Sequence, residues 1–269
     1  MGAGLSRRRN RGGSRYKVAG AAATGRSHVG ANTPCQDRIG FERTMDMAAV
    51  ALADGAGSRA FSQHGAAIVV RSALRLLMSQ FDTLYTLCEK NPAAAGRFIH
   101  KRLKHELHRL ARRLRCDESA LASTLLCAAH KDNRFVAAHL GDGVIVQVNA
   151  QGAASTLSHP DNGEFTNTTY FVTDSSAPSK IRLYHGSDTS DLAGLVLMSD
   201  GCAESLYEKS TGNPASAVAK LVAWTQDLKQ DEISKILNAN MQQLFTRKSA
   251  DDCSLILLSP PRNSVRSHG

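Results

Sequence analysis

Four acidic elements border apolar runs at widely separated places in this chain. They are Asp54-Gly55, Asp142-Gly143, Asp200-Gly201 and Asp251-Asp252. An apolar run of about six residues has the length of a buried strand, and an Asp-Gly pair at its end supplies a turn and a carboxylate. Residues so far apart can share one site only if their strands lie side by side, as they do in a sandwich of sheets.

Carboxylates gathered at strand ends offer the oxygen ligands that hard divalent cations such as Mg²⁺ prefer. A single Asp-Gly pair is also ordinary hairpin punctuation. The segment 141–143 illustrates this second interpretation, since it is predicted to join strands 135–140 and 144–148 as a tight hairpin. Repetition of the pattern favours a metal site over four unrelated turns.

The length and composition of the chain fit one catalytic domain with two tails. The 269 residues are 42% hydrophobic, enough for one substantial core. We expect the domain over 17–259, a disordered basic tail over 1–16 and a flexible tail over 260–269. No apolar stretch approaches the ~20 residues of a membrane-spanning helix, and no secretory segment opens the chain. The expected location is therefore the cytoplasm, with no membrane span.

Six cysteines are scattered along the chain without a CxxC pair, and most stand among apolar residues. This pattern is typical of reduced thiols packed in a core rather than of disulfides. Zinc is disfavoured as well, because no Cys/His pair has the usual ligand spacing.

The order of the periodic segments predicts the layers of the fold. Strands are expected at 17–23, 38–42, 45–53, 123–129, 135–140, 144–148, 195–198 and 254–258. Helices are expected from Ser62 onward with a break at Asn91-Pro92, then at 97–115, 214–228 and 231–245. The stretch 150–190 is a long polar insert. Paired helices between sets of strands favour an α+β fold, a four-layer αββα sandwich of two mostly antiparallel sheets flanked by helix pairs.

The expected helix at 97–115 carries much of the net charge of +9. Its apolar stripe consists of Phe98, Leu103, Leu107, Leu110 and Leu114, so its basic residues face water. Two interpretations stay open: a solvated helix face, or a docking surface for an anionic partner. Nucleic acid is disfavoured as a partner, because no aromatic platform or recognisable binding module accompanies the charges.

The acidic elements also match, in order, the motifs of one family. The segment 49–57, AVALADGAG, resembles the VADGxGG signature of the metal-dependent protein phosphatases of type 2C. Other motifs of that family are similar to Gln36-Asp37, Ser123-Thr124, 140–143, 198–202 and 251–255. The matches extend from about residue 17 to 258.

This resemblance implies a two-sheet sandwich that holds two Mg²⁺ or Mn²⁺ ions, with a weaker third, and hydrolyses phosphoserine and phosphothreonine with a water that bridges the metals. The implied metal ligands are Asp37, Asp54, the Gly55 carbonyl, Asp142, Asp200 and Asp251. Asp54 would bridge both metals, Asp200 and Asp251 would complete the second, and these three would be the catalytic residues. Asp37 would act through coordinated water, and Asp142 would share the third metal with Asp200.

Two departures from the family pattern concern the substrate. Ala56 stands where eukaryotic members have a histidine taken as general acid. Residues 32–34 lack the arginine that binds the phosphate, which leaves Arg26 and His28 as the nearest candidates. The segment 163–173 is expected to form a flap beside the active site, similar to that of compact bacterial members.

The function implied by this resemblance is a compact, bacterial-type protein serine/threonine phosphatase acting on phosphoproteins, as the counterpart of a Ser/Thr kinase. An alternative is a catalytically weak or inactive pseudophosphatase that binds phosphoproteins as a regulatory module. Retention of all the strand-end aspartates argues for the enzyme, since a binding module for anions gains nothing from concentrated negative charge.

Overall fold

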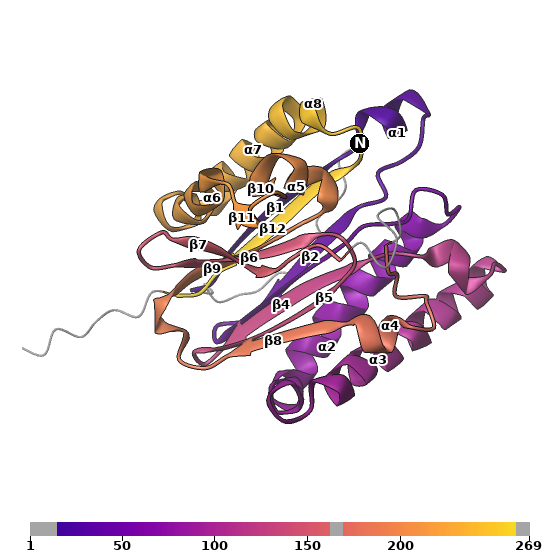
Figure 1. Ribbon diagram of the computed structural model, residues 1–269, viewed down its shortest axis with the longest axis horizontal. Coiled ribbons are helices and arrows are strands. Elements are labelled where there is room, and N and C mark those ends of the chain that lie inside the picture. Colours follow the sequence, from indigo (N-terminus) through magenta and orange to yellow (C-terminus); the bar gives the residue numbers. More distant parts are fainter. Residues whose placement is uncertain (1–14, 162–168, 262–269) are drawn as a thin grey trace, which may run out of the picture.

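The computed structural model describes residues 15–161 and 169–261 (Figure 1). Two five-stranded antiparallel sheets pack face to face, and helices cover the outer face of each. The predicted four-layer αββα sandwich is confirmed. The expectations for residues 1–14, for 163–168 of the flap and for residues 262–269 lie outside the described residues. Tyr16 is buried, and its hydroxyl donates to the Asp46 carbonyl, so the packed region includes the residue before Lys17.

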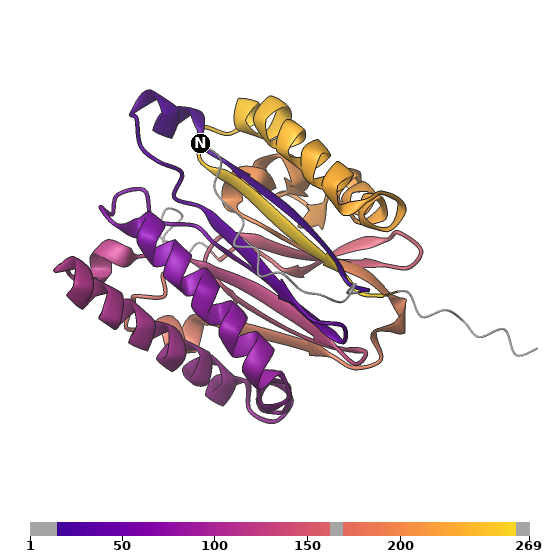
Figure 2. The same cartoon turned by 180° about the vertical axis from the view of Figure 1, so that it is seen from behind.

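The first sheet has the order β2-β3-β4-β5-β8. Its strands are β2 (Arg38–Arg43), β3 (Met47–Ala53), β4 (Leu125–Lys131), β5 (Arg134–Leu140) and β8 (Arg182–Gly186). The long helices α2 (Ser62–Lys90) and α3 (Pro92–Leu114) lie across its outer face (Figure 2). The Asn91 side chain caps α3 by accepting a hydrogen bond from the Ala94 N–H, and Pro92 occupies the first turn, which confirms the predicted break.

The second sheet has the order β1-β12-β9-β6-β7. Its strands are β1 (Lys17–Ala23), β12 (Cys253–Ser259), β9 (Leu192–Met198), β6 (Val144–Asn149) and β7 (Ala154–Ser158). Its covering helices are α6 (Ser216–Asp227) and α7 (Gln230–Asn240). The helix predicted at 231–245 ends its regular part at Asn240 and continues as a π-helical turn, η3 (Met241–Phe245), before α8 (Thr246–Lys248).

Strand β3 shows why the layers pack closely. Every residue of β3 is buried, and side chains alternate between the two faces of the sheet. Val50 and Leu52 enter the core between the sheets. Ala49 and Ala51 face the helices, where their small side chains let α2 approach the sheet. The core between the sheets and the two cores under the helices together fix the strand ends that carry the aspartates.

The predicted hairpin at 141–143 is wrong. Strand β5 pairs with β4 and β8, whereas β6 pairs with β7 and β9 in the other sheet. The segment is therefore a crossover between the two sheets. Gly141 has φ +116°, and a Cβ there would lie 2.6 Å from the Thr124 Cγ2, so this crossover requires glycine. Local turn chemistry is the same for a hairpin and a crossover, and only the pairing of distant strands separates them.

Several short elements were not predicted. Helices α1 (Arg26–Gly30) and α5 (Asp200–Leu206) begin within expected loops or turns, and the polar insert contains β7, β8 and α4 (Ala177–Lys180). The remaining short elements are η1 (Glu118–Leu121), η2 (Thr189–Asp191), β10 (Tyr207–Glu208) and β11 (Asn213–Pro214). All six cysteines are free, as predicted, and four of them are buried. Among the helices described, none has both the length and the apolar character needed to cross a membrane.

Candidate active site

The registers of the two sheets bring the ends of seven strands to the same end of the sandwich. Antiparallel pairing places the start of β2 beside the end of β3, and the end of β5 beside the start of β4. In the other sheet it places the last residue of β9 between the starts of β6 and β12. The pairs that fix this are Arg38 with Ala53, Leu125 with Leu140, Val144 with Met198 and Leu255 with Met198.

Every one of these strand ends except the start of β4 lies within two residues of a predicted aspartate, and Asp142 lies between the end of β5 and the start of β6. Burial raises the pKa of Asp54 well above its usual range, and the charges of Asp37, Asp200, Asp142 and Asp251 raise it further, in that order. The five carboxylates therefore act on one another as a single acidic cluster. The structure brings together every aspartate of the predicted metal set, with Gly55 directly after Asp54.

The strand motif Ser123-Thr124 positions Asp54. The Asp54 N–H donates to Thr124 Oγ1 at 2.9 Å, and the Thr124 N–H donates to the Asp54 carbonyl at 2.8 Å. Gly55 forms an isolated antiparallel bridge with Ser123. These contacts fix the turn after β3, so the Asp54 carboxylate is held by the sheet rather than by a free loop.

Asp37 is the most buried member of the acidic cluster, with no exposed surface. Burial raises the pKa of Asp37 to about 7. Its two carboxylate oxygens have no well-formed hydrogen bond among the described residues, although Ser199 and Ser254 lie close by. A buried carboxylate left in this state is costly, and a bound cation would offset that cost.

Asp200 and Asp142 belong to the part of the acidic cluster that borders the second sheet. Burial, followed by the charge of Asp142, raises the pKa of Asp200 to about 7, while the Gly201 N–H donates to Asp200 Oδ1 at 2.7 Å. Burial also raises the pKa of Asp142, against the effect of a hydrogen bond donated by Thr169 Oγ1 at 2.5 Å. Thr169 belongs to the described part of the expected flap, which therefore reaches the acidic cluster.

The donor chemistry of the acidic cluster fits a hard divalent cation. Its members are oxygen ligands only, they repel one another, and one of them is buried without well-formed partners. Over residues 15–161 and 169–261, no three acidic, histidine or cysteine side chains are already arranged as a complete ligand set. The indication of a cation thus comes from accumulated buried charge and from the chemistry of the donors.

Asp252 has a role that the sequence analysis missed. It is 2% exposed, and its two carboxylate oxygens accept separate hydrogen bonds, from the Gly25 N–H at 2.7 Å and from the Gln36 N–H at 2.6 Å. His28 Nδ1 lies 3.0 Å from its Oδ1. Asp252 therefore ties the start of α1 and the residue before Asp37 to the loop that carries Asp251. The available signal was the second acid of the 251–252 pair, which stands where the resembled motif has asparagine.

The two phosphate candidates lie in different surroundings. Arg26 is exposed, and its Nε donates to the Ser249 carbonyl at 3.4 Å. His28 is 17% exposed and rests on Asp252. A Cβ placed on Gly57, in the turn after Asp54, would lie 4.0 Å from His28 Nε2. His28 therefore lies closer to the turn that carries Asp54.

Lys209 is a second feature missed from the sequence. Its charge lowers the pKa of Asp142, against the larger effect of burial, so the ammonium group lies within electrostatic reach of the acidic cluster. Lys209 directly follows β10, and its side chain is exposed. A single lysine in a polar segment has no recognisable sequence pattern. Lys209 comes near Asp142 only because its segment folds back against the second sheet, where β11 contacts β7.

Solved structures with this fold include bacterial serine/threonine phosphatases. Stp1 from Staphylococcus aureus matches with a TM-score of 0.62 and 16% identity, over 95% of this chain and 99% of that one. RsbX, solved in complex with magnesium, matches with a TM-score of 0.55 and 12% identity, over 91% of this chain and 94% of that one. At these identities the likeness shows the fold.

The sequence comparisons identify the class, a protein serine/threonine phosphatase. The chain is 27% identical over 174 residues to serine/threonine-protein phosphatase 3 of Escherichia coli (strain K12), which is 63% of this chain and 67% of that protein. The family model for protein phosphatase 2C matches residues 24–244. Because that match spans most of the chain, the chain belongs to the protein phosphatase 2C family.

Proposed function

We propose that this phosphatase removes phosphate from phosphoserine and phosphothreonine of proteins with the help of Mn²⁺ or Mg²⁺ held by the acidic cluster. The observation that carries the proposal is the concentration of five aspartates at one end of the sandwich, four of them with a pKa raised by burial. Phosphate is an anion, so a site formed by these carboxylates can accept it only when cations offset the negative charge. The magnesium complex of RsbX supports this choice of ion class.

Within the acidic cluster we assign the central ligand positions to Asp54, Asp200 and Asp251, with the Gly55 carbonyl beside them. Asp37 and Asp142 would take the outer positions. Two ions with a weaker third stay a prediction. Bound divalent ions would supply Lewis acidity, lowering the pKa of water and stabilising charge on the departing oxygen. In this scheme Thr124 keeps Asp54 in place and Thr169 restrains Asp142.

For the phosphate contact we favour His28 over Arg26. His28 Nδ1 lies 3.0 Å from Asp252 Oδ1, without a well-formed hydrogen bond among the described residues, and Nε2 lies toward the turn that follows Asp54. Arg26, by contrast, is exposed and contacts a backbone carbonyl. Substitution of His28 by alanine should raise KM for a phosphopeptide about tenfold, since a hydrogen bond to a charged group contributes ~1.5 kcal/mol. An unchanged KM for H28A, with a raised KM for R26A, would reverse the assignment.

The experiment that tests the function is phosphate release from three matched peptides that carry phosphoserine, phosphothreonine or phosphotyrosine, with MnCl₂ or with EDTA. We expect release from the first two with Mn²⁺ and none with EDTA. Metal binding without release from any peptide would favour the alternative, an inactive phosphoprotein-binding module. A cytoplasmic location and a Ser/Thr kinase as counterpart stay predictions from the sequence.

A further inference from the structure

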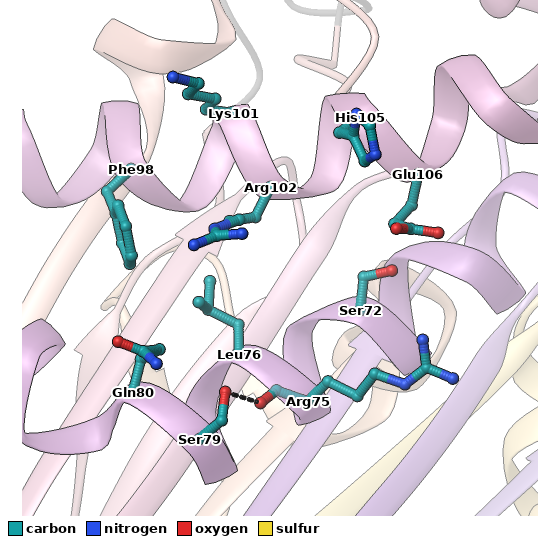
Figure 3. Close-up of a pocket in the computed structure, with 10 residues that line it drawn as sticks. All are labelled: Ser72, Arg75, Leu76, Ser79, Gln80, Phe98, Lys101, Arg102, His105 and Glu106. Carbon is teal, nitrogen blue, oxygen red and sulfur yellow. Dashed lines mark hydrogen bonds between the residues drawn. The ribbon is translucent and has the colours of Figure 1, made fainter.

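The outer side of the α2–α3 helix pair is hollowed by a groove of about 580 Å³ (Figure 3). We call it the α2–α3 groove. Its walls come from both helices, with side chains three or four residues apart on each, so it runs along the helix pair. Leu76, 6% exposed, and Phe98, half-buried, supply its apolar surface. The rest of its lining is polar or charged.

The α2–α3 groove carries positive charge that no acidic side chain neutralises within the described residues. Arg75, Lys101 and Arg102 line it and are exposed, and among the described residues none of the three forms an ion pair. The Arg102 guanidinium instead lies 5.5 Å over the Phe98 ring. The one carboxylate in the lining, Glu106, lies 3.4 Å from Arg109 on its own helix.

The neighbouring cations of α3 show the contrast. Lys104 and His108 both contact Glu118 at 2.9 Å. On the same helix, therefore, the cations on one side contact a carboxylate of the chain. The cations that border the α2–α3 groove have no such contact among the described residues and can pair with an external anion.

A second, independent feature is the hydroxyl of Ser72 in the lining. Ser72 is 7% exposed, and its Oγ forms no hydrogen bond within the described part of the chain. Figure 3 shows this side chain between the two helices, on the wall opposite Glu106. A buried hydroxyl without a partner costs free energy, which a polar group of a bound segment would recover.

We propose that the α2–α3 groove binds a short acidic segment of a partner protein. Carboxylates of that segment would pair with Arg75, Lys101 and Arg102, and one apolar side chain would rest on Leu76 and Phe98. Phe98 and Glu106 are eight residues apart on α3, about 12 Å along the helix axis. About four residues of extended chain span that distance. The partner thus needs only a short stretch that combines acidic residues with one large apolar residue.

The aromatic content of the α2–α3 groove favours a peptide over a nucleic acid. Single-stranded nucleic acids stack their bases on open aromatic faces. Here Phe98 is the one Phe, Tyr or Trp among the lining residues, and Arg102 lies over its ring. The groove is also separate from the acidic cluster. Helix α2 begins at Ser62, shortly after the turn that carries Asp54, and the first residue of the groove, Ser72, lies ten residues, or about 15 Å, further along this helix. Docking there can fail while phosphatase activity persists.

The test compares two triple variants in a binding assay. The groove variant is R75E/K101E/R102E, and the matched control is K90E/R97E/R113E, which makes the same charge change at exposed residues of the same helices outside the lining. The probe is a fluorescein-labelled peptide of glutamates around one leucine, with a glutamine version as reference. Anisotropy would be followed at low and at physiological salt.

We expect the wild type to bind the glutamate peptide at least about tenfold more tightly than the glutamine peptide. The groove variant should lose that preference, since three partly exposed ion pairs at about 0.5 kcal/mol each amount to roughly tenfold. The control should change affinity by no more than about threefold through long-range charge. Equal losses in both variants would overturn the proposal, because they would show general basicity rather than a groove.

Two further measurements complete the test. Hydrolysis of p-nitrophenyl phosphate should be unchanged in both triple variants, and this also reports folding; if the groove variant fails to fold, R75Q/K101Q/R102Q replaces it. A labelled single-stranded DNA of similar length serves as a competitor. DNA binding that is tighter than peptide binding and is lost in the groove variant would contradict the peptide assignment.

Discussion

The acidic cluster and the α2–α3 groove are both charged regions of the described part of the chain, and they are built in opposite ways. The acidic cluster gathers carboxylates from strand ends distant in sequence and buries most of them, so that their pKa values rise. The groove gathers cations from neighbouring turns of two helices and leaves them exposed. Buried like charges are costly and demand a counter-ion, whereas exposed like charges cost little.

The comparison indicates how strongly each region constrains function. Burial and mutual repulsion make the ionised aspartates of the acidic cluster costly, and this is the strongest physical argument that the cluster binds a cation. The exposed cations of the α2–α3 groove cost little free energy without a ligand. The argument for binding there therefore depends on side chains that have no partner among the described residues. The predicted effects of substitution are correspondingly large in the first region and small in the second.

The largest effect is expected from Asp54→Asn. This change removes one charge from the centre of the acidic cluster, where the proposed metal ions would contribute several kcal/mol to transition-state stabilisation. We expect kcat for p-nitrophenyl phosphate with Mn²⁺ to fall on the order of 10³-fold. Circular dichroism should remain that of the wild type. Activity within a few-fold of the wild type would break the contrast between the two regions.

The second effect is an unusual pH dependence of the metal-free protein. Asp37 and Asp200 have a pKa of about 7 when folded, against 3.8 for an ordinary aspartate. Between these values the folded state holds protons that the unfolded state has released, so stability falls as pH rises toward about 7. The slope is at most about 1.4 kcal/mol per pH unit for each carboxyl.

Urea denaturation in EDTA between pH ~5 and ~8 would measure this dependence. Asp37→Asn should flatten it, because the variant has one titrating carboxyl fewer. Added Mn²⁺ should restore stability most at the upper end of the range. A free energy of unfolding that rises with pH across this range would contradict the account.

An intermediate effect is expected from Asp252→Asn. The two carboxylate oxygens of Asp252 accept from different backbone donors, Gly25 and Gln36, and an amide offers only one acceptor. One buried N–H would then face an NH₂ group, at a cost of about 1–3 kcal/mol. Denaturation of the metal-free variant measures this, with Asp251→Asn as the control of similar charge. Equal stability of the variant and the wild type would show that Asp252 contributes no more than an asparagine.

The smallest effect is expected from R75Q/K101Q/R102Q in the α2–α3 groove. Exposed cations without ion pairs contribute little to folding, so the free energy of unfolding should change by less than about 0.5 kcal/mol per site. Turnover of p-nitrophenyl phosphate should stay within about twofold. Loss of turnover in this variant would couple the groove to the acidic cluster and remove the distinction between them.

The layers and the acidic cluster could be predicted because strand and helix periods are local and the family motifs occur in order. The prediction of a hairpin at 141–143 was wrong because hairpins and crossovers use the same turn residues. Asp252 and Lys209 could not be assigned, since their roles depend on where α1 and the turn after β10 return in space. The basic helix was predicted correctly as an amphipathic helix, but which of its cations lack a partner depends on Glu118 and Glu106.

The most direct test of the central claim is calorimetric titration of Mn²⁺ into the metal-free wild type and into Asp54→Asn. If the five aspartates form a divalent-cation site, the wild type should bind Mn²⁺ with heat and release protons near pH ~7, because carboxyls with raised pKa must ionise on binding. The variant should bind at least about tenfold more weakly. Absence of binding to the wild type, or equal binding to both proteins, would contradict the assignment of this site.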